Sequence, residues 1–414
     1  MAEIREQLER RRAAAAEAWD VDDAVVLVEA GEEIPVPGRG DRTYPFRAHA
    51  EYFYLTDRER PGGVLAFDPG EGWIEFVKPV TAEELLWTGL EGDREGVPEG
   101  TRPLDELEDW LADRTTRRLG ATDEADEELR NELIRVRRPK DEVELERMRV
   151  AEEATRAGFE ELVRLIEPGL TERELQVSLE ATFLRSGGDF LAYESIVAAG
   201  DHAAVLHFSP TSRELKAGEL LLVDAGVEYR AYASDVTRTY SIGGELDGEQ
   251  RLVWETVRRA CEASIAACKP GVEWREVHRV AALIIADGLV ELGVLSGDPE
   301  PLLESGAVTL FFPHGIGHMV GLGVRDAGVA SDEIRDQVPG LPRMRLDIPL
   351  QPRHAWTVEP GIYFVAPLLA RHRDRTDVNW NRVDELLGFG GVRIEHNVLI
   401  TDDGCDVLTE AIPL

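Results

Sequence analysis

The 414-residue chain has only three cysteines and four lysines, and it has no long uninterrupted apolar run. Cys261, Cys268 and Cys405 show no CxxC spacing, which excludes a disulfide framework or a cysteine-based structural zinc site built from them. No stretch reaches the ~18 apolar residues of a membrane span, and the charged amino terminus MAEIREQLERRRAAAAEAWD has no signal-peptide core. We therefore expect reduced thiols and a cytoplasmic protein.

Positive charge is also scarce. The chain has 46 Lys and Arg residues against 81 Asp and Glu residues, a formal net charge of −35. A surface of this sign repels polyanions, so nucleic acid and an anionic membrane surface are excluded as expected partners. The length suits two domains.

Two patterns of predicted secondary structure divide the chain into two domains. Short strand-like runs alternate with helical ones up to about residue 136, which predicts a small α/β domain over residues 1–136. A helical stretch begins near Pro139, with apolar residues every three or four positions. Beyond it, strand pairs alternate with amphipathic helices expected at 171–186, 248–269 and 273–292. We predict an α+β second domain over residues 137–414 that repeats a plan of helices followed by an acid-bearing hairpin.

The stretch 220–240, LLLVDAGVEYRAYASDVTRTY, is predicted to form a hairpin that turns at 228–230. Asp224 lies within the first strand and Asp235 within the return strand. An unpaired carboxylate among apolar residues costs several kcal/mol, roughly, and two facing carboxylates repel unless a proton or cation lies between them. A bound divalent metal is the simplest interpretation.

A second strand pair, at 355–364 and 388–401, carries Glu359 and Glu395. For one buried acid a salt bridge is the alternative, and Arg393 stands close to Glu395. Four acids on two comparable hairpins would need that explanation four times, so metal binding is favoured.

Two histidines lie between the hairpins, in LFFPHGIGHMVGLGVRDAG. His314 and His318 are four residues apart, but the glycines at 315 and 317 indicate a loop rather than a zinc-binding helix. Both need not be ligands. One imidazole with four carboxylates suits manganese, with cobalt or zinc as alternatives, and offers more ligands than one ion needs.

These motifs resemble those of the proline-specific metallopeptidases of the pita-bread fold, prolidase and aminopeptidase P. The similarity lies in LLLVDAG, SDVTRTY, PHGIGHMVGL, TVEPGIYF and GGVRIEHNVLIT, and more weakly in DRTYPFRAHAEYFYLT of the amino-terminal domain. It implies that the second domain binds two divalent ions that share a bridging hydroxide. The metal ligands it implies are Asp224, Asp235, His318, Glu359 and Glu395, with Asp235 and Glu395 bridging.

The segment after Glu359 resembles bacterial prolidase, and Arg345 stands fourteen residues before Glu359, where prolidases bind the carboxylate of the substrate proline. We therefore expect an Xaa-Pro dipeptidase. Xaa-Pro aminopeptidase activity on longer peptides is the alternative, and a partner-binding protein without activity is less favoured. For Arg345 the alternative is a solvated loop arginine.

The resemblance assigns further residues. It implies Glu359 as the general base, His207 and His314 as further catalytic residues, and a homodimer. Substrate contacts are expected from Arg345, Arg393, Arg325 and Arg47. Arg325 stands where the family has a histidine, so it either binds a carboxylate or pairs with Asp326, and Arg47 is otherwise a surface arginine at a sheet edge.

Overall fold

The computed structural model describes residues 2–88, 95–120 and 125–414. The chain divides into two compact units. One comprises Met1–Arg137 with Ala330–Asp332, and the other comprises Arg138–Val329 with Glu333–Leu414. None of the described helices is long and apolar enough to cross a membrane.

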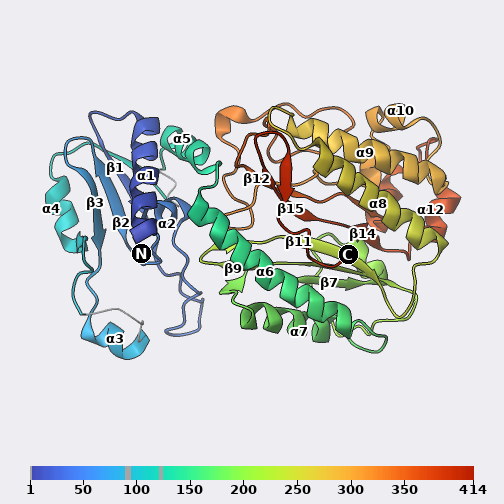
Figure 1. Ribbon diagram of the computed structural model, residues 1–414, viewed down its shortest axis with the longest axis horizontal. Coiled ribbons are helices and arrows are strands. Elements are labelled where there is room, and N and C mark those ends of the chain that lie inside the picture. The colour runs from blue at the N-terminus through green and yellow to red at the C-terminus, as the bar shows by residue number, and fades with distance from the viewer. Residues whose placement is uncertain (1, 89–94, 121–124) are drawn as a thin grey trace. The chain divides into compact units, whose positions relative to one another are not determined.

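The amino-terminal unit contains a five-stranded sheet in the order β4-β3-β2-β1-β5, in which β1 pairs antiparallel with β2 and parallel with β5 (Figure 1). The apolar strand β1 is almost wholly buried at its centre, as expected of a strand covered on both faces. The elements are α1 Ala2–Trp19, β1 Val25–Glu29, α2 Ala50–Thr56, β2 Val64–Asp68, β3 Gly72–Val77, α3 Ala82–Thr88, β4 Arg102–Pro103, α4 Leu107–Leu111, β5 Thr116–Leu119 and α5 Glu127–Arg137.

The second unit begins with two helices and a set of short strands. Capping boxes start both helices, with Asp141 and Glu144 on α6 and Thr171 and Glu174 on α7. Their apolar faces share one core with β7, β8 and β11. The elements are α6 Glu142–Leu165, α7 Glu172–Arg185, β6 Phe190–Leu191, β7 Ile196–Ala199, β8 Leu220–Ala225, β9 Val227–Tyr229, β10 Tyr232–Ala233 and β11 Val236–Ser241.

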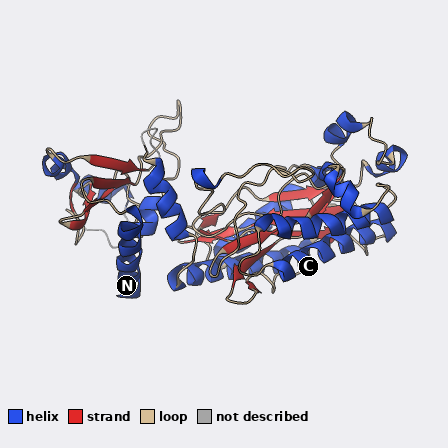
Figure 2. Cartoon of the chain, turned by 90° about the horizontal axis from the view of Figure 1, so that it is seen from above, coloured by secondary structure: helices blue, strands red, loops and turns tan. Residues whose placement is uncertain are grey.

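The rest of the unit repeats this plan. A capping box of Asp247 and Gln250 starts α8, and α8 and α9 pack on β12, β15 and the strands beside them. The elements are α8 Gly248–Ala267, α9 Trp274–Glu291, α10 Pro299–Glu304, β12 Ala355–Val358, β13 Gly361–Tyr363, α11 Ala366–Leu369, α12 Trp380–Leu386, β14 Gly391–Arg393, β15 His396–Ile400 and β16 Cys405–Val407. Figure 2 shows the long helices of the unit along one side of its strands.

Both acid-bearing hairpins are broken in the middle. In the first, β8 pairs with β11, while β9 pairs with β10 in a separate sheet. Gly226 stands at the break, where an added Cβ would lie 1.9 Å from the carbonyl oxygen of Ser234. The prediction that Asp235 lies inside the return strand is therefore wrong, because Asp235 occupies the gap between β10 and β11.

The second hairpin is broken at the equivalent place. The pairing of β12 with β15 ends at Val358 opposite His396, and the pairing of β13 with β14 starts at Gly361 opposite Arg393. Glu359 and Glu395 lie in the two gaps and not inside the strands that the sequence predicts to carry them. At these gaps the backbone leaves the regular hydrogen-bond ladder between the strands. This lets the acidic side chains turn toward one side of the strands.

Candidate metal centre

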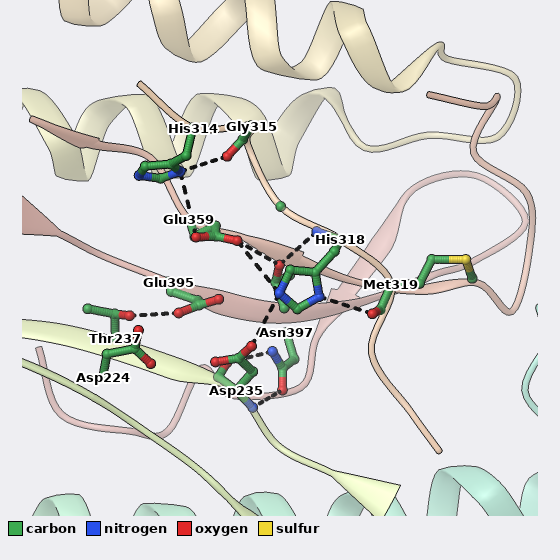
Figure 3. A network of polar contacts seen from close by, with 12 residues as sticks. Asp224, Asp235, Thr237, His314, Gly315, His318, Met319, Glu359, Glu395 and Asn397 are labelled. Carbon is green, nitrogen blue, oxygen red and sulfur yellow. Dashed lines mark hydrogen bonds and ion pairs between the residues drawn. The ribbon is translucent and has the colours of Figure 1, made fainter. Parts of the chain in front are cut away.

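Three of the five predicted ligands form a compact cluster. One ligand atom from each of Asp235, His318 and Glu395 lies within 4.8 Å of the other two (Figure 3). The His318 Nε2 atom is 3.4 Å from Asp235 Oδ2. One imidazole and two carboxylates from three separate segments therefore converge on one point.

The other two predicted ligands adjoin this cluster. Glu359 Oε1 lies 3.8 Å from the same His318 nitrogen. Asp224 lies on β8 directly opposite Thr237 of β11, and the Thr237 hydroxyl donates to Glu395 Oε2 at 2.6 Å. All five side chains line one cavity of about 550 Å³. The predicted set is thus brought together, with Asp224 and Glu359 flanking the central three.

Neighbouring strand residues hold the backbone beside the ligands. Asn397 receives a hydrogen bond from the Asp235 backbone N–H and donates to the Asp235 carbonyl oxygen, at 3.0 and 2.7 Å. Thr357, on β12, has its hydroxyl 3.5 Å from Glu359 Oε1 and accepts from the His318 backbone N–H. These bonds fix the backbone that carries Asp235 and His318 before any ion binds, which lowers the cost of assembling the site.

His318 is held in the tautomer that a metal ligand needs. Its Nδ1 lies 3.0 Å from the Met319 carbonyl oxygen, and because a carbonyl only accepts, Nδ1 carries the proton. The Nε2 atom then faces the acids and can offer its lone pair to an ion. Gly317 permits the close approach, since an added Cβ would lie 2.1 Å from the Thr357 carbonyl oxygen, at a φ of +155°.

The pKa values of three clustered acids are raised, because these carboxyl groups are buried close to one another. Burial raises the pKa of Glu359 to about 7, although His318 and Arg393 oppose the rise. Burial, and then the neighbouring carboxylates, raise the pKa of Glu395 well above its ordinary value. Burial also raises the pKa of Asp224, against the effect of Arg393. Divalent cations would relieve this repulsion, so the residues present fit a metal centre.

Arg393 has a partner that the sequence did not suggest. Its guanidinium donates to Asp224 Oδ2 at 2.5 Å, to the Tyr363 hydroxyl at 2.9 Å and to the Thr237 hydroxyl at 3.0 Å. The pairing with Glu395 considered above is not the one observed. This side chain is only 5% exposed, and its ion pair with Asp224 positions that carboxylate. The contact of Arg393 with substrate stays a prediction.

The two predicted catalytic histidines line the same cavity but differ in their surroundings. His314 Nδ1 lies 2.8 Å from the Gly315 carbonyl oxygen, and Nε2 lies 2.9 Å from the Tyr363 hydroxyl. Burial lowers the pKa of His314 to about 3, so its ring is neutral. His207 is exposed, and its ring forms no hydrogen bond within the described residues.

Of the predicted substrate-binding arginines, Arg345 and Arg325 line the cavity. The alternative in which Arg325 pairs with Asp326 is wrong, because Asp326 forms a fully buried ion pair with Lys140 at 2.9 Å. Arg47 belongs to the amino-terminal unit, where it lies 3.7 Å from Glu59, and its substrate contact also stays a prediction.

Sequence reasoning missed several residues that shape the site: Tyr193, which donates to Asp224 at 2.7 Å, together with Thr237, Thr357, Tyr363, Asn397, Glu194 and Arg343. A usable signal existed for three of them. In the sequence, Thr237, Thr357 and Asn397 each stand two positions from a predicted ligand in a strand-like run, and alternate residues of a strand share a face.

Comparisons with known proteins agree with this geometry. Residues 146–402 match the metallopeptidase family M24, and residues 8–117 match the aminopeptidase P N-terminal domain. The chain belongs to metallopeptidase family M24. Its two parts, an aminopeptidase P-type amino-terminal domain and a pita-bread catalytic domain of mixed α and β structure, confirm the predicted fold class.

Named relatives of this M24 protein carry two activities. A probable Xaa-Pro aminopeptidase of Botryotinia fuckeliana is 33% identical over 94% of this chain and 90% of its own. The Xaa-Pro dipeptidase of Homo sapiens is 35% identical over 68% of this chain and 59% of its own. The structure of aminopeptidase P from E. coli with the inhibitor Pro-Leu has a TM-score of 0.83 and 26% identity, covering 99% of this chain and 95% of that one.

The raised pKa values predict that a bound metal ion stabilises the folded protein more at high pH than at low pH. The folded-state pKa of Glu359 lies above its ordinary value, so in the metal-free M24 protein this group's contribution to stability is lost as pH rises toward about 7. Metal ligands bind deprotonated, and one released proton changes the apparent dissociation constant about tenfold per pH unit. Saturation with Mn²⁺ should therefore raise the melting temperature by about 4 °C more at pH 8 than at pH 5.5. Scanning fluorimetry with and without the ion measures this, and equal shifts at both pH values would contradict it.

Proposed function

We propose that the protein is an Xaa-Pro aminopeptidase, which releases the first residue of a peptide whose second residue is proline. The observation that carries the proposal is the joining of Asp235, His318 and Glu395 with Glu359 in one cavity, in a chain similar to Xaa-Pro aminopeptidases along nearly its full length. The sequence motifs alone favour the dipeptidase, whereas the relatives favour its alternative.

The five clustered residues Asp224, Asp235, His318, Glu359 and Glu395 would hold two divalent ions, which we propose to be manganese, with cobalt or zinc as alternatives. When bound, such ions supply Lewis-acid polarisation of the scissile carbonyl and lower the pKa of water toward neutrality. The oxygen-rich ligand set is the reason for placing manganese first.

Glu359 is the proposed general base. Its carboxylate lies at the edge of the cluster, with one oxygen toward His318 and the other 3.7 Å from His314 Nδ1. A carboxylate that lines the substrate cavity beside the cluster can accept a proton from water and return it. The carboxylate would accept the proton of the attacking water and deliver it to the leaving proline nitrogen.

The two histidines would act on the substrate itself. The exposed ring of His207 offers a donor where negative charge develops on the carbonyl oxygen. Hydrogen bonds from Arg393 to the Tyr363 hydroxyl, and from that hydroxyl to His314 Nε2, fix the imidazole of His314. We therefore propose that His314 contacts the bound peptide and holds it in position. An Xaa-Pro bond has no amide hydrogen, and recognition must therefore come from side chains such as these.

A second candidate function, Xaa-Pro dipeptidase, is favoured by Arg345. This arginine lines the metal cavity, and its guanidinium has no hydrogen-bond or ion-pair partner within the described residues. A free guanidinium there would bind the carboxylate of a proline that ends the substrate, through a charge-assisted hydrogen bond.

Replacing Arg345 tests the dipeptidase role directly. If the guanidinium binds a terminal proline carboxylate, Arg345→Ala should raise KM for Ala-Pro about 10–100-fold, because a hydrogen bond to a charged group is lost, and should change KM for Ala-Pro-Ala much less. Steady-state kinetics measure the change in KM for each of the two peptides. Equal effects on the two peptides would contradict the carboxylate contact.

The experiment that tests the proposed function is hydrolysis of Ala-Pro-Ala and Ala-Pro by the manganese-loaded protein, followed as free alanine. We expect the tripeptide to be cleaved with the higher kcat/KM. Cleavage of the dipeptide alone would replace the aminopeptidase by the dipeptidase, and cleavage of neither would favour a protein that only binds partners. Assembly into a homodimer stays a prediction.

A further inference from the structure

A second cavity, of about 660 Å³, adjoins the metal cavity. We call it the loop cavity, because all its lining residues except Arg275 come from the segment 329–347, most of which has no regular secondary structure. Arg343 and Arg345 line both cavities. The two hollows thus meet at these arginines, which lie upstream of β12 and Glu359 in the chain.

The wall of the loop cavity combines six apolar residues with charged residues and with the polar residues Asp336 and Gln337. Its apolar lining residues are Val329, Ile334, Val338, Leu341, Pro342 and Met344. Among the charged residues, Arg275 pairs with Asp347, Arg335 with Glu273 and Arg138 with Glu333. Ile334 is 64% exposed, although it stands in an apolar wall. An apolar wall left open in this way suits an apolar ligand group.

The arginines at the junction lack partners. Within the described part of the chain, the side chains of Arg343 and Arg345 form no hydrogen bond or ion pair, although acidic residues are abundant and neighbouring arginines are paired. A guanidinium left free in a protein of net charge −35 is poised for an acceptor that arrives from outside. Peptide carbonyl oxygens and a carboxylate are such acceptors.

We propose that the loop cavity binds the substrate residue that follows proline, and that it selects peptides whose third side chain is apolar. The inference rests on the proposed aminopeptidase function. The scissile bond lies at the metal ligands, the peptide then passes Arg343 and Arg345, which donate to its carbonyl oxygen or terminal carboxylate, and the third side chain lies against Ile334 and its apolar neighbours.

The test compares Ala-Pro-Leu with Ala-Pro-Ala in the wild-type protein and in Ile334→Asn. Wild type should cleave Ala-Pro-Leu with a kcat/KM about tenfold higher, which is the scale of discrimination by an apolar pocket. The variant should lose most of that preference, because its kcat/KM for Ala-Pro-Leu falls toward its value for Ala-Pro-Ala. Val177→Asn makes a comparable change at an exposed apolar residue of α7 that lines neither cavity, and should leave both values unchanged.

A second readout does not depend on cleavage of the test peptide. Pro-Leu, which the E. coli relative carries as an inhibitor, should inhibit the wild type about tenfold more strongly than it inhibits Ile334→Asn, and free proline should inhibit both equally. Active protein with no preference for Ala-Pro-Leu, and with equal inhibition constants for Pro-Leu, would overturn the inference while leaving the proposed function in place. Protein that cleaves no Xaa-Pro peptide would overturn the proposed function as well.

Discussion

Replacing Glu359 by glutamine is expected to lower kcat for Ala-Pro-Ala about a thousandfold, because the amide cannot accept the proton of the attacking water. Glutamine keeps the size of the side chain and one oxygen that can face His318. The loss should therefore appear in kcat more than in KM. Metal content measured on the same sample separates loss of the base from loss of an ion.

Glu194→Gln is the matched control for this change. Glu194 is exposed and lines the same cavity, but it is not one of the clustered ligands. Removing its charge alters the net charge of the cavity equally, and kcat should stay within about threefold of wild type. A Glu359→Gln protein that keeps its metal and its full activity would refute the general-base assignment.

Replacing Arg393 by methionine is expected to lower the free energy of unfolding of the metal-free protein by about 3–5 kcal/mol, because the buried Asp224 carboxylate loses its compensating cation. The variant also leaves the Tyr363 and Thr237 hydroxyls without the donor observed at 2.9 and 3.0 Å. Urea denaturation near pH 8 measures the effect, since the raised pKa of Asp224 permits protonation at lower pH to relieve part of the cost.

The matched control for Arg393 is Arg343→Met, which removes a cavity arginine that has no described partner. A surface change of that kind should alter the free energy of unfolding by at most about 0.5 kcal/mol. If Arg393→Met were as stable as Arg343→Met, the ion pair with Asp224 would not be needed to hold the ligand, and the account of how that acid is positioned would be wrong.

The helices of the second unit were predictable because their signals are local. The expected helices 171–186, 248–269 and 273–292 end within two residues of α7, α8 and α9. Capping boxes at Thr171 and Asp247 mark the starts of α7 and α8, and regular apolar spacing marks all three helices. Both signals act within one or two turns of the chain.

The breaks in the hairpins depend on distant contacts and were missed. The apolar pattern continues through Asp235 and predicts a strand there, whereas the break arises where Gly226 meets the Ser234 backbone. Arg393 stands two residues from Glu395, but β14 ends between them, so the arginine turns to Asp224, 169 positions away. The ligand candidates could be identified from the chemical type of their side chains. Which charged side chains form ion pairs is seen only in the folded chain.

The most direct test of the metal centre is a titration of metal-free protein with Mn²⁺, followed by the rate of Ala-Pro-Ala hydrolysis and by metal analysis of the active protein. We expect negligible hydrolysis without metal and a rate that rises with added Mn²⁺ and saturates when two ions are bound per chain. Full hydrolysis by protein that contains no divalent metal would contradict it.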